Sequence, residues 1–226
     1  MNDVVDITQG LAVVAACWAV ISGVDAWKRE FIGKRQIELA EEVLSRFFEL
    51  RDAIAFIRSP FSSESEGKSR AKDPSEGREV ELILNRAFIV YERYGKREAT
   101  FNAFRSLKYR FMANFGSQHE YIFSGVDRQL NSVFVAAQML GLHYWQRQGR
   151  VEMTPEERKE HLSQMWEQEQ IFWDHGKDDD PVRTELSKLQ QDLEKVVLPC
   201  FTESMQTYSV LTKRFWLVKL GRVGNG

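Results

Sequence analysis

Positions spaced alternately three and four residues apart form an unbroken line through residues 12–57. This spacing keeps one face of a helix turned towards a partner. The first half of the line, the lining residues, consists mostly of small and polar residues: Ala12, Ala15, Ala19, Ser22, Ala26, Arg29, Gly33 and Gln36. The second half, the seam residues, is mainly large and apolar: Ala40, Val43, Phe47, Leu50, Ile54 and Ile57. The pattern predicts one long helix, which either supercoils or bends at Gly33.

An apolar run from Ile7 to Val24 contains no charged residue. As a helix its 18 residues would extend about 27 Å, roughly the hydrocarbon core of a bilayer. Acidic residues precede the run and basic ones follow it from Lys28, which argues against a signal peptide and places the N-terminus outside. We expect a single pass through a bacterial inner membrane, with a periplasmic N-terminus and the bulk of the chain in the cytoplasm. The alternative for so short a run is a buried helix in a soluble core.

Small residues gather on one side of this run, including the pairs Ala12/Ala16 and Ala19/Gly23. In lipid, where helices gain nothing by hiding apolar surface from each other, close approach of backbones favours association. We therefore expect the lining residues to face sister copies, around a pore axis if enough copies assemble. The seam residues would continue the same contact below the membrane, although an added apolar row at Ile37, Leu44 and Phe48 suits a helical bundle.

The rest of the chain reads as helices, so the predicted fold class is all-α, with a transmembrane helix continuing into a cytosolic helical bundle. The expected segments are a transmembrane segment at 1–27, a juxtamembrane helix at 28–58, a flexible loop at 59–77, a cytosolic helical domain at 78–198 and a basic, hydrophobic tail at 199–226. Within the domain, Gly116 would end one helix and Ser117 with Glu120 would form a capping box for the next. Thr154 and Asp180 would each open another helix. The tail would lie on the anionic inner leaflet or dock onto the bundle.

Basic residues alternate with aromatic ones in the helix expected at 78–115. Such a pattern suits a nucleotide or single-stranded nucleic acid, because cations bind phosphates and rings stack on bases. The candidate ligand-binding residues are Arg93, Lys96, Arg97, Arg105, Lys108 and Arg110. The alternative is a core-facing aromatic row beside a solvated basic face.

Other chemistry has little support in the sequence. The net charge of −2 gives no overall affinity for nucleic acid. The two cysteines, Cys17 and Cys200, are too far apart in the chain to suggest a disulfide scaffold. Phosphate-binding loops, nucleophile elbows and metal-ligand spacings do not occur. We expect no catalytic residue, no metal and no cofactor.

Two stretches carry a resemblance, WKREFIGKRQIELAEEVLSRFFELRDAIAFIRSPF and ERYGKREATFNAFRSLKYRFMANFG. They resemble a widespread group of bacterial single-pass membrane proteins of unknown function. The layout of a short span and a cytosolic helical domain also resembles the membrane effector of the Hailong anti-phage defence system. That resemblance implies an oligomeric channel held closed through its cytosolic part by a nucleic-acid-like signal made by a partner enzyme. It assigns no functional residue.

We therefore expect a homo-oligomeric inner-membrane protein that forms a channel gated by its cytosolic helical domain, in anti-phage defence. Its partners would be the lipid bilayer, copies of itself and a nucleotide or oligonucleotide ligand. Two alternatives stay open: a passive anchored scaffold that recruits a cytosolic partner, and a membrane module that senses a nucleotide or oligonucleotide.

Overall fold

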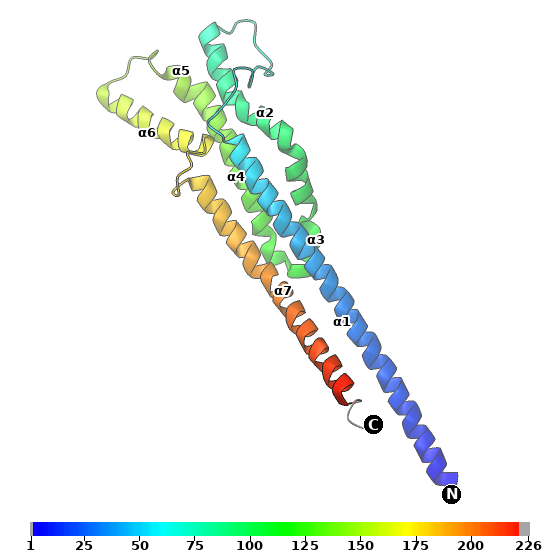
Figure 1. Ribbon diagram of the computed structural model, residues 1–226. Coiled ribbons are helices and arrows are strands. Elements are labelled where there is room, and N and C mark those ends of the chain that lie inside the picture. The colour runs from blue at the N-terminus through cyan, green and yellow to red at the C-terminus, as the bar shows by residue number, and fades with distance from the viewer. Residues whose placement is uncertain (1, 222–226) are drawn as a thin grey trace. The chain divides into compact units, whose positions relative to one another are not determined.

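The computed structural model describes the backbone of residues 2–221 and the side chains of residues 16–24, 27–28 and 30–201 (Figure 1). Within this part every regular element is helical and there is no strand, which confirms the all-α prediction. The chain divides into two units, Glu42–Val196 and the remaining terminal parts.

Two long helices contribute to both units. Helix α1 covers Asn2–Ile57 and passes through Gly33 without a break. Helix α7 covers Pro181–Gly221 and contains Pro199 in its interior. We expected the helical domain to end at residue 198, but the helix continues past this point. A proline removes one backbone donor but leaves the turns on either side able to form. The side chains of 202–226 lie outside the described residues, and with them the predicted membrane or bundle contact of the tail.

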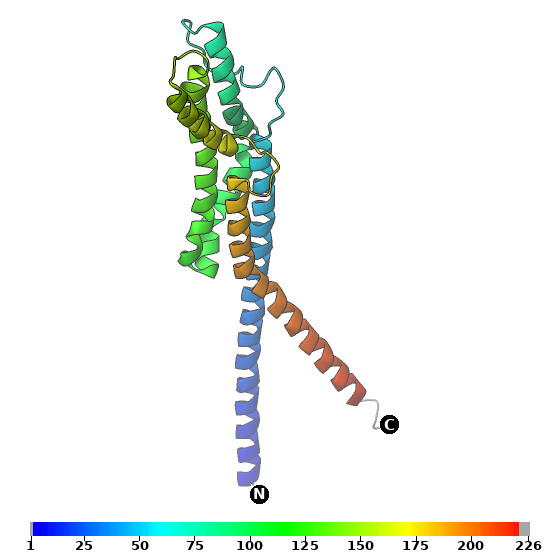
Figure 2. The same ribbon diagram turned by 90° about the vertical axis from the view of Figure 1, so that its left-hand side faces the viewer.

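The unit Glu42–Val196 is a helical bundle. Its further elements are α2 (Arg78–Ser106), α3 (Lys108–Phe115), a 3₁₀ turn (Ser117–His119), α4 (Glu120–Met139), a π-helical turn (Leu140–Tyr144), α5 (Trp145–Arg147) and α6 (Pro155–Phe172). Helix α4 packs against both α2 and α6 (Figures 1 and 2). The helix predicted over 78–115 is thus divided at Leu107.

Aromatic side chains join α1 to the rest of this bundle. The ring of Phe47 meets Phe104 of α2 edge to face, with 5.9 Å between centroids. Phe104 in turn stacks on Phe123 of α4 at 4.6 Å, and Phe111 of α3 lies 5.6 Å from the same ring. These rings are at most 2% exposed, so they form a continuous apolar core across four helices.

The seam residues belong to this core. Five of them lie in the bundle unit and are at most 2% exposed: Val43, Phe47, Leu50, Ile54 and Ile57. Ala40 is also fully buried. The expectation that the seam faces sister copies is therefore corrected, because the seam side chains of the bundle unit are packed within their own chain.

Several helix ends follow the local signals in the sequence. Gly116 ends α3 with a φ of +105°, a conformation that favours glycine. Thr154 and Glu157 form the capping box that opens α6. The capping box predicted at Ser117 is wrong, since that residue begins a 3₁₀ turn without a side-chain cap and Glu120 instead accepts from Lys108.

Candidate functional site

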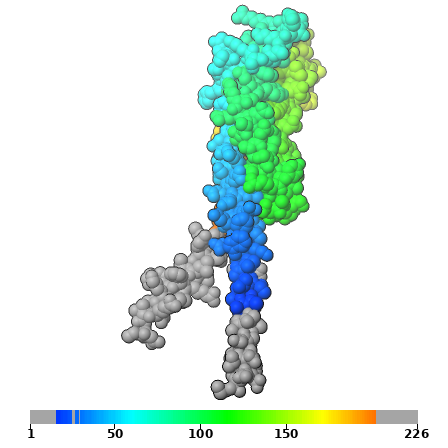
Figure 3. All heavy atoms as spheres, turned by 90° about the vertical axis from the view of Figure 1, so that its right-hand side faces the viewer, coloured from blue at the N-terminus to red at the C-terminus, as the bar shows by residue number. Residues whose placement is uncertain are grey.

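The N-terminal part of α1 exposes large apolar side chains. Over residues 16–32 they are Trp18 (73% exposed), Val20 (66%), Ile21 (62%), Val24 (44%), Trp27 (64%), Phe31 (44%) and Ile32 (56%). Figure 3 shows one side of this segment in blue. Exposed apolar surface on this scale is unusual for a soluble helix, because burying each such side chain stabilises a folded protein by about 1.5–3 kcal/mol.

Large and small side chains occupy different sides of this segment. At about 100° per residue, the large residues between Trp18 and Ile32 spread over roughly half of the helix circumference. The other half carries Ala16, Ala19, Ser22 and Gly23. The small side therefore lets another helix approach closely, while the large side suits an apolar environment.

Four of the lining residues have described side chains. Ala19 is exposed, while Ser22, Gly33 and Gln36 are partly exposed. The Ser22 hydroxyl donates to the carbonyl of Trp18 one turn earlier, so the helix itself satisfies this polar group. The side chains of the other four, namely Ala12, Ala15, Ala26 and Arg29, lie outside the described residues.

The side chains of Ile7 to Ala15, the first half of the apolar run, likewise lie outside the described residues. Among the residues that the structure does describe, no helix is long and apolar enough to pass through a membrane.

Arg93, a candidate ligand-binding residue, is 2% exposed. Its guanidinium donates to both carboxylate oxygens of Glu66, at 3.1 and 2.9 Å. It also donates to the carbonyls of Ile57 and Ser59, at 3.3 and 2.6 Å, where α1 ends. A cation at a helix C-terminus stabilises the unpaired carbonyls, so Arg93 caps α1 and holds the loop that contains Glu66.

The other candidate basic residues lie along α2 and α3 rather than around one cavity. Lys96 lies 3.9 Å from both Glu66 and Glu92, and the Arg97 guanidinium lies 4.9 Å above the ring of Phe56. Further along, each cation pairs with a carboxylate of another element: Arg105 with Asp127 at 2.8 Å, Lys108 with Glu120 at 2.5 Å and Arg110 with Glu42 at 3.3 Å. The structure therefore supports helix-to-helix pairing on this basic face, and it does not gather the six residues into one binding site.

A second buried arginine has a role that the sequence analysis did not foresee. Arg58 is 1% exposed and donates to the carbonyls of Ile171 and Trp173 at the end of α6, at 2.7 and 2.9 Å. It also forms a two-point ion pair with Asp180, at 2.8 and 2.7 Å. Asp180 accepts from the backbone N–H of Arg183 and so caps α7 as predicted. One side chain thus joins the ends of three helices.

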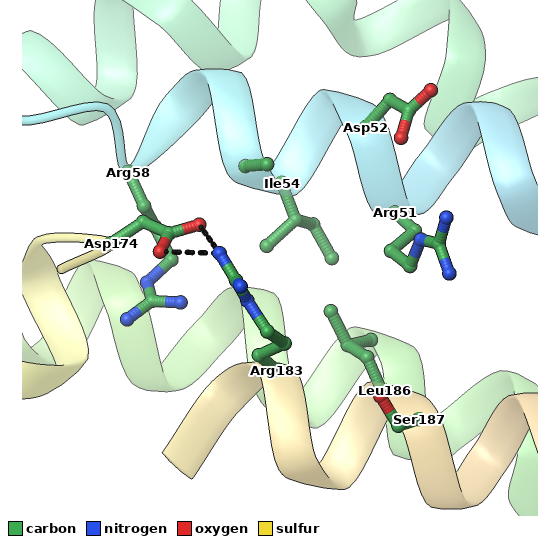
Figure 4. Close-up of a pocket in the computed structure, with 9 residues that line it drawn as sticks. Arg51, Asp52, Ile54, Arg58, Asp174, Arg183, Leu186 and Ser187 are labelled. Atoms are coloured by element: carbon green, nitrogen blue, oxygen red, sulfur yellow. Dashed lines mark hydrogen bonds and ion pairs between the residues drawn. The ribbon is translucent and has the colours of Figure 1, made fainter. Parts of the chain in front are cut away.

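A pocket of about 330 Å³ lies beside this junction. Its lining residues are Arg51, Asp52, Ile54, Ala55, Arg58, Asp174, Arg183, Leu186 and Ser187 (Figure 4). Arg183 donates to both carboxylate oxygens of Asp174, at 2.9 and 3.1 Å, and Arg51 donates to Gln190 at 2.8 Å. The arginines of this pocket are therefore already engaged by the chain's own side chains.

The charges of the pocket also stabilise each other. Burial alone would raise the pKa of Asp174, but hydrogen bonds from the Gly176 backbone and from Arg183 lower that pKa below its ordinary value. Asp174 is therefore ionised at neutral pH and balances Arg183. Such mutual neutralisation indicates a structural polar cluster rather than a charged site awaiting a ligand.

Among the described residues, no group of three or more His, Cys, Asp or Glu side chains is placed to hold a metal ion. Comparison with known proteins finds no matching family model, no matching curated protein and no matching solved structure.

Proposed function

We propose that this chain is a membrane-anchored helical protein that assembles with copies of itself through the N-terminal part of α1. The observation that carries the proposal is the exposed apolar surface between Trp18 and Ile32. A soluble protein would bury these side chains, and burial in lipid or against other helices removes the same unfavourable contact with water. The run from Ile7 onwards extends this surface in the sequence.

The division of α1 into a small and a large side supports assembly beyond simple anchoring. A helix that serves only as a tether has no need for a side of alanine, serine and glycine. Two helices that meet on such sides bring their backbones into van der Waals contact. Because the Ser22 hydroxyl already bonds within its own helix, this polar residue adds no unpaired donor to the contact.

The activity that we propose for the assembly is ion conduction, with the bundle Glu42–Val196 as its control element. A single helix cannot enclose a pore, so conduction requires several copies. Arg29, Gly33 and Gln36 continue the line of the small side in the sequence, and Arg29 and Gln36 would place polar groups around an axis at the cytosolic end. Anti-phage defence would use such a channel to dissipate the membrane potential.

Cross-linking in membranes tests the assembly. In a Cys17→Ser background, Ala19→Cys places a thiol on the small side and Val20→Cys places one on the large side. We expect mild oxidation to produce disulfide-linked dimers from Ala19→Cys and few from Val20→Cys. Equal cross-linking at both positions, or at neither, would overturn the assignment of the small side as the contact.

Conduction is tested separately by the membrane potential of cells that overproduce the protein. The wild-type chain should depolarise the cells. Ala19→Leu should abolish that effect, while Val20→Phe, which adds bulk on the large side, should not. If the Ala19→Cys variant cross-links but the wild-type protein never depolarises cells, an anchored scaffold would remain as the function.

A further inference from the structure

We infer that the side of α1 from Trp27 to Arg35 is a contact surface for the headgroups of anionic phospholipids. This inference rests on the proposed membrane anchoring and adds which lipids the anchor contacts and where along α1 the headgroup layer lies.

The first support is a gradient along one column of the helix. Val20, Val24, Trp27, Phe31 and Arg35 follow each other at spacings of three or four residues and so share one side. Along this column the side chains change from aliphatic to aromatic to cationic. A bilayer changes in the same order, from hydrocarbon to the interface that aromatic rings favour and then to the charged headgroups.

The second support is the geometry of the aromatic and cationic groups. The rings of Trp27 and Phe31 stack with 5.8 Å between centroids and 20° between planes. The guanidinium of Arg35 lies over the Phe31 ring, 4.5 Å from its centroid. Both rings are about half exposed or more, so these stacked side chains lie on the surface of the helix rather than in a core. Together they form an apolar surface of two rings with a guanidinium at one end.

The third support is unbalanced charge. Lys28, Lys34 and Arg35 are exposed, and in the described part of the chain none of the three is paired with a carboxylate. Arg105 in the bundle differs, since Asp127 holds it at 2.8 Å. Cations near a bilayer attract anionic lipid, and each strengthens that attraction about fivefold. A lipid phosphate is therefore the partner that fits both the charge and the aromatic base.

Lipid retention tests this surface. The full-length protein is reconstituted in vesicles of equal parts phosphatidylglycerol and phosphatidylcholine, extracted with mild detergent, and its bound lipids are measured by mass spectrometry. We expect an excess of phosphatidylglycerol on the wild-type protein. In the triple variant Lys28→Gln, Lys34→Gln, Arg35→Gln, the ratio of retained phosphatidylglycerol to phosphatidylcholine should fall at least about fivefold.

The matched control removes three exposed cations from the bundle, Arg158→Gln, Lys159→Gln and Lys177→Gln, and should keep the preference of the wild-type protein. Equal retention of both lipids by the wild-type protein, or an unchanged preference in the triple variant, would overturn the inference. Flotation of the vesicles distinguishes membrane anchoring from the preference for anionic lipid. A protein that does not float with vesicles contradicts the proposed anchoring as well, whereas one that floats without lipid preference contradicts only this inference.

Discussion

Helix α1 contains two regions that share one spacing of residues and differ in what surrounds them. From Val43 to Ile57 the line of positions is at most 2% exposed and packs within the bundle. From Ala16 to Ile32 the neighbouring apolar side chains are largely exposed, and the line itself consists of small residues except for Arg29. The same three–four spacing therefore serves an internal core in one region and, in our proposal, a contact between copies in the other.

The difference shows that spacing identifies a contact face but not its partner. The size of the residues and the character of the flanking positions decide the partner. In the C-terminal region, large residues on the line meet rings such as Phe104, and charged residues such as Glu41 and Glu49 occupy the outer side. From Ala16 to Val24, small residues on the line and large apolar residues beyond it leave no side suited to water.

The largest expected effect comes from truncation in the buried region. Phe47→Ala removes a fully buried ring that contacts Phe104 and should lower the free energy of unfolding by about 3–5 kcal/mol. The adjacent Phe48, which is 36% exposed, provides the matched control: Phe48→Ala should lower the free energy of unfolding clearly less. Thermal unfolding of the detergent-solubilised protein, followed by circular dichroism, measures both. Equal losses would mean that the two regions of α1 do not differ as described.

An insertion of bulk in the exposed region should act on assembly rather than on folding. Ala19→Leu overfills the small side and should weaken association by about 1–3 kcal/mol, because a close backbone contact no longer forms. The unfolding transition of the bundle should stay unchanged. Dilution-dependent dissociation in detergent measures the first quantity and circular dichroism the second. A variant that unfolds earlier but associates normally would reverse the roles we give to the two regions.

The end of the buried region should be sensitive to acid. The hydrogen bond from Arg93 lowers the pKa of Glu66 below its ordinary value of 4.5. Because the folded-state pKa is the lower one, the stabilisation is complete above the unfolded pKa and is lost as the pH falls through the folded value. Glu66→Gln should cost on the order of 1 kcal/mol at pH 7. The difference from wild type in urea unfolding should shrink below pH 4.5, and a difference that grows there would contradict this sign.

The smallest effect is expected at Gly33. The structure has one helix through this position, and a Cβ built there meets no atom within 4 Å. Gly33→Ala should therefore raise helix stability by about 0.5–1 kcal/mol without loss of assembly. A loss of helical content on substitution would show that α1 bends at Gly33.

Local signals in the sequence predicted much of the fold. The helix end at Gly116, the helix start at Thr154 and the cap at Asp180 depend on neighbouring residues and were predicted correctly. The capping box, however, was predicted at Ser117 and lies at Thr154. The burial of the seam followed from its apolar spacing, although its partner did not. The continuation of α7 through Pro199 was missed, because a proline weakens a helix without always ending it.

The polar junctions were not predictable, because their partners are far apart in the chain. Arg58 and Asp180 are separated by 122 residues, and Arg93 and Glu66 by 27. No periodic pattern connects such pairs. The basic, aromatic pattern of α2 and α3 favoured a ligand site because the sequence does not show which carboxylates pair with these cations. The carboxylates that pair with Arg105 and Arg110 come from other helices.

The mass of the detergent-solubilised full-length protein, measured by light scattering with the detergent contribution subtracted, tests the central claim most directly. We predict a mass that is a fixed multiple of the 26.3 kDa chain and that falls to a single chain in Ala19→Leu but not in Val20→Phe. A wild-type protein that is a single chain across the measured concentrations would contradict the proposal that the small side of α1 joins copies of this protein.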